Sequence, residues 1–465
     1  MQEVSSLPLQ PPAMPFGEFL EALFQALERE AVRPCILRNY EGFPATNVSN
    51  DVDFLIHPSE LPSAIRALRS IPGIRIVGYA ERRYVAHVFA EGISRPPGIR
   101  ALQIDFISSL CWKGLPYFRA DADTVLQAAI PLQAGNLGFL VSSPVHEAII
   151  SLFSSLLVAT HIKEKYLPKV QRTFTDERLE AIAALLPAFG LKAAARLVDS
   201  VISGDREKIK RCVPSLRVSL ALRSLLRRPI RSVRAVAGYF KREFAVRFSP
   251  KNLETICILG PHGCGKTTII ESLMPILESS AKILERRDIN PRLLFGRTAL
   301  GEAATSGSSA GLPGRSPVSV AMLGELLIKE WLIHFSKKQS IVLRLDESYY
   351  HDLLINLKGR SDEGPVWLVR LFLRLFPSPD LWILLDPAAG GLHSENQDVI
   401  SGETLRQLEA YRSFVKARKR YVVLDASKPP ASVTETAYAA IIDVLAQRTD
   451  RQFKNRFGSV GIRCL

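Results

Sequence analysis

The chain has 465 residues, of which 47% are hydrophobic and 23% are charged. These fractions exclude a disordered or fibrous protein, and the length predicts about three structural units. The formal net charge of +14 at pH 7 is compatible with nucleic-acid, anionic-lipid or polyphosphate partners. It is equally compatible with a charged surface that keeps the protein soluble.

The cysteines and the apolar segments indicate the cellular compartment. The six cysteines are scattered, without a CxxC pair or the spacing of a zinc site, which favours a reduced protein. Residues 1–15 are rich in proline and do not resemble a secretory signal. The most apolar window, residues 148–159, is too short to span a bilayer. We therefore expect a cytoplasmic protein with no transmembrane segment.

The N-terminal part, residues 16–143, is expected to form a small α+β unit. Apolar residues recur at helical spacing between Phe16 and Glu30, which predicts an amphipathic helix. A second helix is predicted near residues 61–70. Strands separated by Gly, Pro and Asn loops are predicted at Cys35 to Leu37, Val52 to Ile56, Arg83 to Phe89 and Leu102 to Ile107.

Residues 144–249 have an almost wholly helical pattern and contain no convincing strand. Helix breaks are expected at Pro168, Pro187, Gly190, Pro214 and Pro229.

Residues 250–450 have a different pattern, in which continuous apolar runs alternate with helical segments. Such runs are typical of strands buried on both faces, so we expect an α/β domain with a doubly wound parallel sheet. The loop from Gly301 to Ser319, rich in small residues, is expected to be mobile. The runs are Thr255 to Leu259, Ser340 to Leu345, Leu381 to Leu385 and Tyr421 to Leu424.

A glycine-rich segment follows the first of these runs and has the G-x-x-x-x-G-K-T spacing of a phosphate-binding P-loop. The glycines allow backbone N–H groups to turn toward one phosphate cluster. Lys266 would neutralise the β- and γ-phosphates, and Thr267 would ligate magnesium. The segment reads Gly260, Pro261, His262, Gly263, Cys264, Gly265, Lys266, Thr267 and Thr268.

Acidic residues follow two of the later runs. Asp346 and Glu347 come at the end of one run, where a magnesium-organising acid is expected, and Asp346 is the predicted metal ligand. Two solvated acids that merely close a strand are the alternative. Asp386 ends the next run and is either a second polar group at this edge or a structural turn acid.

The segment from Thr255 to about Ala446 resembles the thymidylate-kinase-like P-loop family, particularly the forms encoded with bacterial surface-polysaccharide genes. The resemblance implies ATP and Mg²⁺ as cofactors and places Asp425 and Ser427 near the adenine. It rests on the P-loop, on Ser348 to Leu354, on Phe376 to Asp386, on Leu405 to Arg412 and on Val423 to Pro429.

Two positions depart from that family's pattern. Where the family has an Asp-Arg pair, this chain has Glu347-Ser348, and its lid segment, Leu392 to Gln397, has no basic residue apart from His393. Loss of arginines that stabilise the transferring phosphoryl group lowers turnover more than nucleotide binding. Arg360, Arg370 and Arg374 could substitute, although the last two are expected to be surface residues.

Three aspartates in the N-terminal part form a candidate metal site. Asp51 and Asp53 are spaced so that both carboxylates leave the same face of one strand, and Asp105 lies on another predicted strand. Two aspartates and a third from a neighbouring strand are the ligands used in two-metal phosphoryl or nucleotidyl transfer.

The same region resembles an uncharacterised nucleotidyltransferase-like family. The resemblance rests on Leu37 to Gly42, Asp51 to Asp53, Gln103 to Asp105 and Trp112 to Tyr117. The Gly-Ser pair that holds the triphosphate in the superfamily is replaced by Arg38-Asn39. A domain degenerated to a structural role is the alternative to an active site.

Basic residues are concentrated between residues 217 and 247, where nine arginines and lysines accompany one acid. This segment could contact an anionic membrane surface or nucleic acid. The alternative, which Pro229 favours by interrupting the amphipathic run, is a solvated linker whose apolar side packs on a neighbouring domain.

Together these features predict an ATP-dependent phosphotransferase whose acceptor is a nucleotide or a sugar phosphate, with a second nucleotidyltransferase-like site. A nucleotide-binding regulatory or scaffold protein and a nucleic-acid-associated ATPase are the alternatives. The oligomeric state does not follow from the sequence.

Overall fold

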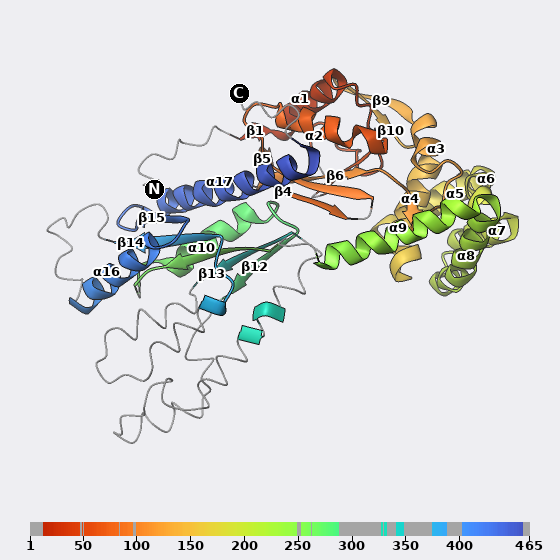
Figure 1. The fold of residues 1–465 in the computed structure, drawn as a ribbon. Coiled ribbons are helices and arrows are strands. Elements are labelled where there is room, and N and C mark those ends of the chain that lie inside the picture. The colour runs from red at the N-terminus through yellow and green to blue at the C-terminus, as the bar shows by residue number, and fades with distance from the viewer. Residues whose placement is uncertain are drawn as a thin grey trace. The chain divides into compact units, whose positions relative to one another are not determined.

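The computed structural model describes residues 13–46, 49, 51–82, 84–95, 99–248, 253–261, 263–287, 327–328, 330–332, 341–347, 374–387 and 402–458. The chain divides into two compact units (Figure 1). One, the N-terminal unit, consists mainly of Ala13–Arg95 and Ala101–Phe248, and the other, the C-terminal unit, mainly of Ser249–Asn455.

The N-terminal unit contains a mixed sheet. Its strand order is β1-β5-β6-β3-β2-β10-β9, with β4 paired to β5, and β7 and β8 form a separate ribbon. β3 runs parallel to β6 and antiparallel to β2. The strands are β1 (Met14–Pro15), β2 (Cys35–Ile36), β3 (Asp51–Leu55), β4 (Arg75–Arg82), β5 (Val85–Arg95), β6 (Ile99–Ile107), β7 (Cys111–Trp112), β8 (Leu115–Pro116), β9 (Ile130–Ala134) and β10 (Leu137–Val141).

Helix α1 (Phe16–Arg29) packs as its apolar periodicity predicts. Phe19, Leu20 and Leu23 are completely buried, and the Phe24 ring lies 5.8 Å from that of Phe54 on β3. α1 also contacts α2 (Leu61–Arg69), which follows the short helix η1 (Pro58–Glu60). The amphipathic helix therefore covers the strand that carries Asp51 and Asp53.

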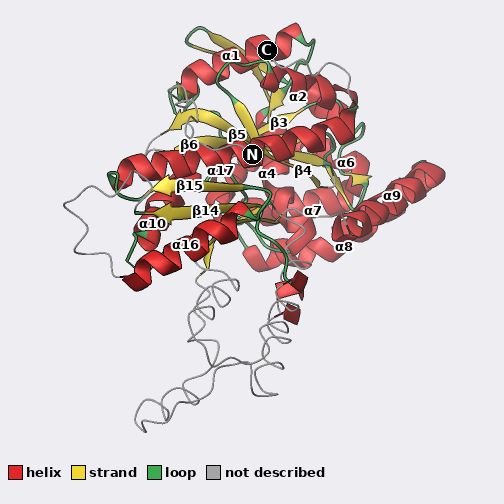
Figure 2. Ribbon diagram, turned by 60° about the vertical axis from the view of Figure 1, so that its left-hand side comes forward, coloured by secondary structure: helices red, strands yellow, loops and turns green. Residues whose placement is uncertain are grey.

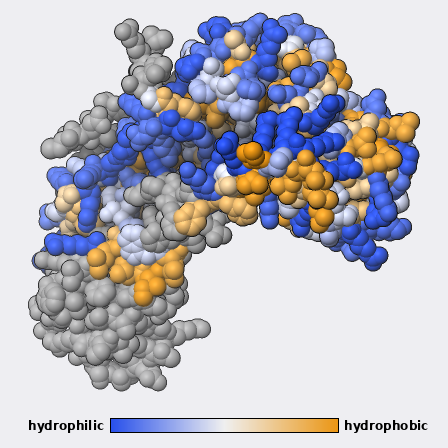
Figure 3. All heavy atoms as spheres, turned by 45° about the vertical axis from the view of Figure 1, so that its right-hand side comes forward, coloured by the Kyte–Doolittle hydropathy of each residue, from blue (hydrophilic) through white to orange (hydrophobic). Residues whose placement is uncertain are grey.

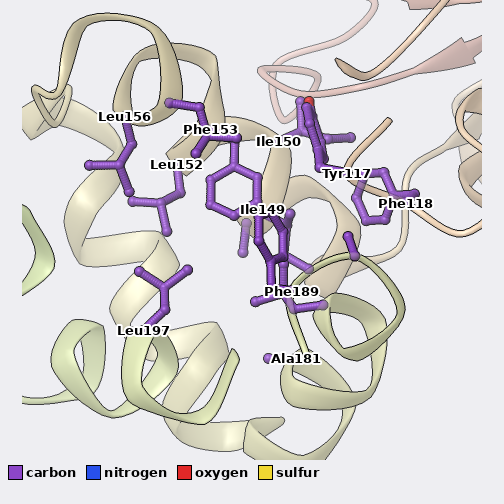
Figure 4. Packing of buried hydrophobic residues seen from close by; sticks show 14 of the residues in the cluster. Tyr117, Phe118, Ile149, Ile150, Leu152, Phe153, Leu156, Ala181, Phe189 and Leu197 are labelled. Atoms are coloured by element: carbon purple, nitrogen blue, oxygen red, sulfur yellow. The ribbon is translucent and has the colours of Figure 1, made fainter. Parts of the chain in front are cut away.

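A helical layer completes the N-terminal unit and shares its core with the sheet. Phe153, on the central helix, lies 5.2 Å from Tyr117 and 5.4 Å from Phe189 between ring centroids (Figure 4). The same cluster includes Cys35 and Leu55 of the sheet. The helices are α3 (Ala122–Gln127), α4 (Pro144–Ala159), η2 (Glu164–Tyr166), α5 (Leu167–Asp176), α6 (Arg178–Phe189), α7 (Leu191–Ile202), α8 (Arg206–Arg227) and α9 (Pro229–Phe248).

The expected helix breaks are correct only in part. Gly190 separates α6 from α7, and Pro168 and Pro229 lie in the first turns of α5 and α9, where proline is tolerated. Pro187 and Pro214, however, lie inside α6 and α8. The buried residues on either side of each proline pack into the common core, which outweighs the backbone hydrogen bond that the proline removes.

The C-terminal unit is built on a five-stranded parallel sheet in the part of the chain that the structure describes. Its order is β12-β13-β11-β14-β15, and every pair in it is parallel. The elements are β11 (Leu253–Leu259), α10 (Lys266–Leu277), β12 (Ile283–Arg287), β13 (Val342–Asp346), β14 (Leu381–Asp386), α16 (Gly402–Lys416), β15 (Tyr421–Asp425) and α17 (Pro430–Phe457).

Both faces of this sheet are covered at its centre. Every residue of β11, β13 and β14 is buried, although their side chains alternate between the faces. On one face Tyr411 and Val415 of α16 pack against Trp382 and Leu384 of β14. The helix α16 and the strand β14 can be followed in Figure 2.

The prediction of a mixed α/β protein with a parallel C-terminal sheet is confirmed. The sequence analysis missed β4 and the edge strand β12, whose residues lack a continuous apolar run. It also missed the strands β1, β7, β8, β9 and β10. The loop from Gly301 to Ser319 lies outside the described residues. No helix in the described ranges is long and apolar enough to cross a membrane.

Phe153→Ala should lower the free energy of unfolding of the N-terminal unit by about 3–5 kcal/mol, because it leaves a cavity between Tyr117 and Phe189. Urea denaturation of the full chain, followed by a signal from this unit, measures the change. Leu179→Ala is the matched control, since Leu179 is 77% exposed. It should change stability by less than about 0.5 kcal/mol, and an equal loss in both variants would contradict the packing argument.

Candidate phosphate and metal sites

The glycine-rich segment predicted to be a P-loop lies between β11 and α10. A Cβ atom on Gly260 would lie 2.5 Å from the Cys264 sulfur and 2.8 Å from the Leu385 carbonyl oxygen, so only glycine fits there. Gly265 caps α10 with φ of +88°, a left-handed conformation that favours glycine. These two positions turn the chain directly from a buried strand into a helix.

The Lys266 side chain lies across the loop. Its ammonium group donates hydrogen bonds to the carbonyl oxygens of Gly260 (2.8 Å) and Pro261 (2.9 Å). The first N–H groups of α10 have no partner within the helix and make its N-terminus an anion-binding position. Burial raises the pKa of the Cys264 thiol, which keeps it protonated and argues against a nucleophilic role.

Thr267 contacts Glu347, the residue that follows β13. Its hydroxyl donates to one carboxylate oxygen of Glu347, and Arg286 donates to the other at 2.8 Å. Burial by itself would raise the pKa of Glu347, but the hydrogen bonds from Thr267 and Arg286 outweigh it and hold that pKa below its ordinary value. Glu347 is thus a carboxylate at neutral pH, beside the threonine of the P-loop.

Asp346 has a different environment, because neighbouring strand residues point to opposite faces. It is completely buried, and neither carboxylate oxygen has a hydrogen-bond partner among the described residues. Burial raises its pKa to about 7, despite the opposing charges of Arg344 and Arg287. Both predicted acids therefore lie at the strand end, but it is Glu347 that reaches Thr267.

A buried ion-pair network lies on the Asp346 side of the strand. Glu330 accepts a hydrogen bond from Arg344 at 2.7 Å and another from Arg287. Burial would raise the pKa of Glu330, but these two arginines lower it below its ordinary value. Arg286 and Arg287 were both missed by the sequence analysis. The signal for them is an Arg-Arg pair at the end of the strand that follows the P-loop helix.

Two further acids follow strands at the same edge. Both oxygens of Asp386 accept hydrogen bonds from Arg412 on α16, at 2.6 and 2.9 Å, so Asp386 anchors that helix. Asp425 accepts hydrogen bonds from the backbone and hydroxyl of Ser427 in an exposed turn after β15. His262, Ser348 to Leu354, Arg360, Arg370 and the segment from Leu392 to Gln397 lie outside the described residues.

In the N-terminal unit, the structure brings the three predicted aspartates together. β3 and β6 are paired so that Asp53 lies opposite Asp105, and Asp51 opposite Gln103. One carboxylate oxygen from each aspartate lies within 4.8 Å of the other two, a spacing that suits a shared cation. Burial, with help from the charges of Asp51 and Asp105, raises the pKa of Asp53 although Arg38 opposes the shift.

Hydrogen-bond partners fix the orientation of these aspartates. The Arg38 guanidinium donates to Asp53 at 2.5 Å, and its carbon lies 5.2 Å from the centre of the Tyr166 ring. His87 and Gln103 each lie 2.8 Å from one oxygen of Asp105. His87 and Tyr166 were missed by the sequence analysis, because only the fold brings β5 beside β6 and Tyr166 of the helical layer against Arg38.

A comparison with protein-family models finds no match to this chain, and a comparison with curated proteins finds none either. Both resemblances therefore rest on the motif residues themselves.

The buried Asp346 carboxyl predicts a pH-dependent component of stability. Between pH 4 and 7 the unfolded chain has released this proton while the folded chain still holds it, so stability falls as pH rises through that window. In metal-free buffer with a chelator, the melting temperature of the C-terminal unit should fall between these pH values. Asp346→Asn should lack that part of the decrease, and identical pH profiles for the two proteins would contradict it.

Proposed function

We propose that the C-terminal unit is an ATP- and magnesium-dependent phosphotransferase that transfers the γ-phosphoryl group to a nucleotide or a sugar-phosphate acceptor. The observation that carries the proposal is the link between Thr267 of the P-loop and Glu347 at the neighbouring strand end. A chance match to the P-loop pattern would not require a carboxylate at this position.

The strand order supports the same assignment. β11 lies between β13 and β14, so the chain leaves β11 toward one side of the sheet and later returns to the other. Ligands of open α/β sheets bind at the carboxyl ends of the strands where the order reverses in this way. Lys266 and Glu347 both lie at that edge.

The residues present fit a magnesium ion. Mg²⁺ prefers oxygen ligands and keeps several waters, and the site offers the Thr267 hydroxyl and the Glu347 carboxylate. When bound, the ion would neutralise charge on the phosphates. The chain contributes the hydroxyl and carboxylate ligands and orients them through Arg286.

The kinase-like family has an arginine at the position of Ser348, and Arg286 offers a guanidinium in its place. Its guanidinium lies 2.8 Å from Glu347 and is about one-third exposed, so it is available at the same edge. The role we propose for Arg286 is to bind acceptor or transferred phosphate oxygens. Lys266 would exchange its two loop carbonyls for phosphate oxygens of ATP, which requires only a side-chain rotation.

Phosphoryl transfer from γ-labelled ATP to a panel of nucleoside monophosphates and sugar phosphates tests this function. We expect Lys266→Ala to lower the rate about 10³-fold, because it removes the ammonium that neutralises the transferring group. Lys416→Ala, an exposed lysine at the end of α16, is the matched control and should retain full activity. If ATP binds with magnesium but no acceptor is labelled, the phosphotransferase proposal fails and the regulatory alternative replaces it.

The second candidate function is a nucleotidyltransferase-like site in the N-terminal unit. It is favoured by the convergence of Asp51, Asp53 and Asp105 from two parallel strands. Arg38 stands where the superfamily has its Gly-Ser pair, and it would have to share Asp53 with the metal. The proposed activity is metal-dependent transfer of a nucleotidyl group.

Metal titration tests this second site. Asp53→Asn combined with Asp105→Asn should weaken Mn²⁺ binding at least about tenfold, because two of three carboxylate ligands lose their charge. Isothermal titration of the full chain without nucleotide measures the affinity, and circular dichroism checks the fold. Asp123→Asn, an exposed acid on α3, is the matched control. Equal Mn²⁺ affinities of the wild type, the double variant and the control would contradict the proposed metal site.

A further inference from the structure

Helix α9 packs with only one of its faces. Ser232 and Tyr239 are buried, Val236 contacts the helical core, and the Ser232 hydroxyl donates to the Ser224 carbonyl of α8 at 2.8 Å. These three residues lie on one side of the helix at spacings of four and three. This face holds α9 against the rest of the N-terminal unit.

A second apolar stripe lies on the neighbouring side of the helix, rotated by about 110° around its axis, and is exposed. Ile230, Val233, Phe240 and Phe244 are 55–68% exposed, and Ala237 between them is exposed as well. The five positions alternate in steps of three and four, so they form one continuous row over about 21 Å of helix. The break expected at Pro229 is present, since α8 ends at Arg227 and α9 begins at Pro229, and the row lies wholly within α9.

Helix α8 adds to the exposed apolar surface. Val218, Leu222 and Leu225 follow one another at i, i+4 and i+7 and are 44–65% exposed, on the side away from the buried Leu216 and Leu220. In the space-filling view, apolar groups lie among hydrophilic ones over the helical part of the chain (Figure 3). Exposed apolar surface of this extent marks an interaction site more often than a solvated linker.

The charges beside the stripe are almost all positive. Arg234 and Lys241 lie next to it, at i+4 from Ile230 and from Ala237. Arg228, Arg231, Arg234 and Lys241 are exposed and form no ion pair within the described part of the chain. Residues 216–248 contain nine arginines and lysines and the single acid Glu243.

We propose that α8 and α9 form a docking surface for an anionic lipid bilayer, on which α9 lies parallel to the membrane plane. Phenylalanines in an apolar row with basic residues beside it are the composition of an interfacial helix. The apolar row would enter the acyl boundary while Arg234 and Lys241 contact lipid phosphates. None of the residues of this surface carries the proposed activity, and the proposal does not depend on that activity.

Charge and chemistry favour this occupant over two others. A second copy of the chain would bring a like excess of positive charge against these helices, which opposes association. A nucleic acid would pair with the arginines but leave the phenylalanine row without an apolar partner. An anionic bilayer offers phosphates to the basic residues and an acyl boundary to the apolar row.

Flotation of the full chain with vesicles tests the proposal. The protein should float with phosphatidylcholine vesicles that contain phosphatidylglycerol, and not with phosphatidylcholine alone. Phe240→Ser with Phe244→Ser, and separately Arg234→Gln with Lys241→Gln, should each lower the partition coefficient by roughly tenfold or more. Leu179→Ser with Leu191→Ser is the matched control, since both are exposed apolar residues outside this surface. It should leave partitioning unchanged.

Several outcomes would overturn the proposal. These are no flotation with the anionic vesicles, an equal loss in the control variant, or full binding by the Phe240→Ser, Phe244→Ser variant. Light scattering that detects a dimer dissociated by that variant would assign the surface to a second copy. Binding to a nucleic-acid homopolymer that the phenylalanine changes leave intact would assign it to nucleic acid. If the phenylalanine variant does not fold, the Arg234→Gln, Lys241→Gln variant replaces it in the flotation test, and full binding by that variant overturns the proposal.

Discussion

The parallel pairing of neighbouring strands is the constraint on which both candidate sites depend. In the C-terminal unit β11 and β13 run the same way, so the P-loop and Glu347 leave the sheet at one edge. In the N-terminal unit the parallel register of β3 and β6 sets Asp53 opposite Asp105. A register shifted by one residue would turn one of these aspartates to the other face. Strand register thus controls the chemistry of each site more directly than any single side chain does.

Burying several charges beside these edges is costly, and the chain offsets the cost with specific partners. Glu330 is held by two arginines, and Asp386 by two of the three nitrogens of the Arg412 guanidinium. Removing one partner of such a pair typically costs about 3–5 kcal/mol, because the other charge remains buried. Asp346 is the exception, since its oxygens have no hydrogen-bond partner in the described part of the chain. Asp346 therefore differs from the other buried acids at this edge, whose charges are paired with arginines.

The helices of the N-terminal unit bury only part of their apolar surface. Its core includes Cys35 and Leu55 of the sheet, so the helices are part of that unit and not a separate linker. Yet α9 has apolar residues on two faces, and the packing uses only one of them. A helix needs one apolar stripe to be held in a globular domain. The second stripe therefore requires an explanation outside the fold of this unit.

The sequence by itself determined the class of the fold, the position of the P-loop and the three aspartates on predicted strands. These features follow from local patterns: apolar runs, helical periodicity and glycine spacing that a few residues define. Only the tertiary structure decided that Thr267 meets Glu347, that Arg286 and Arg287 approach the strand end, and that Arg38 and His87 hold the aspartates. These contacts join residues far apart in the chain through strand order and register, which no local pattern contains. The tertiary structure also decided which side chains of α9 are exposed. Its apolar row has the sequence pattern of a buried face, and only the packing shows that the row is not covered.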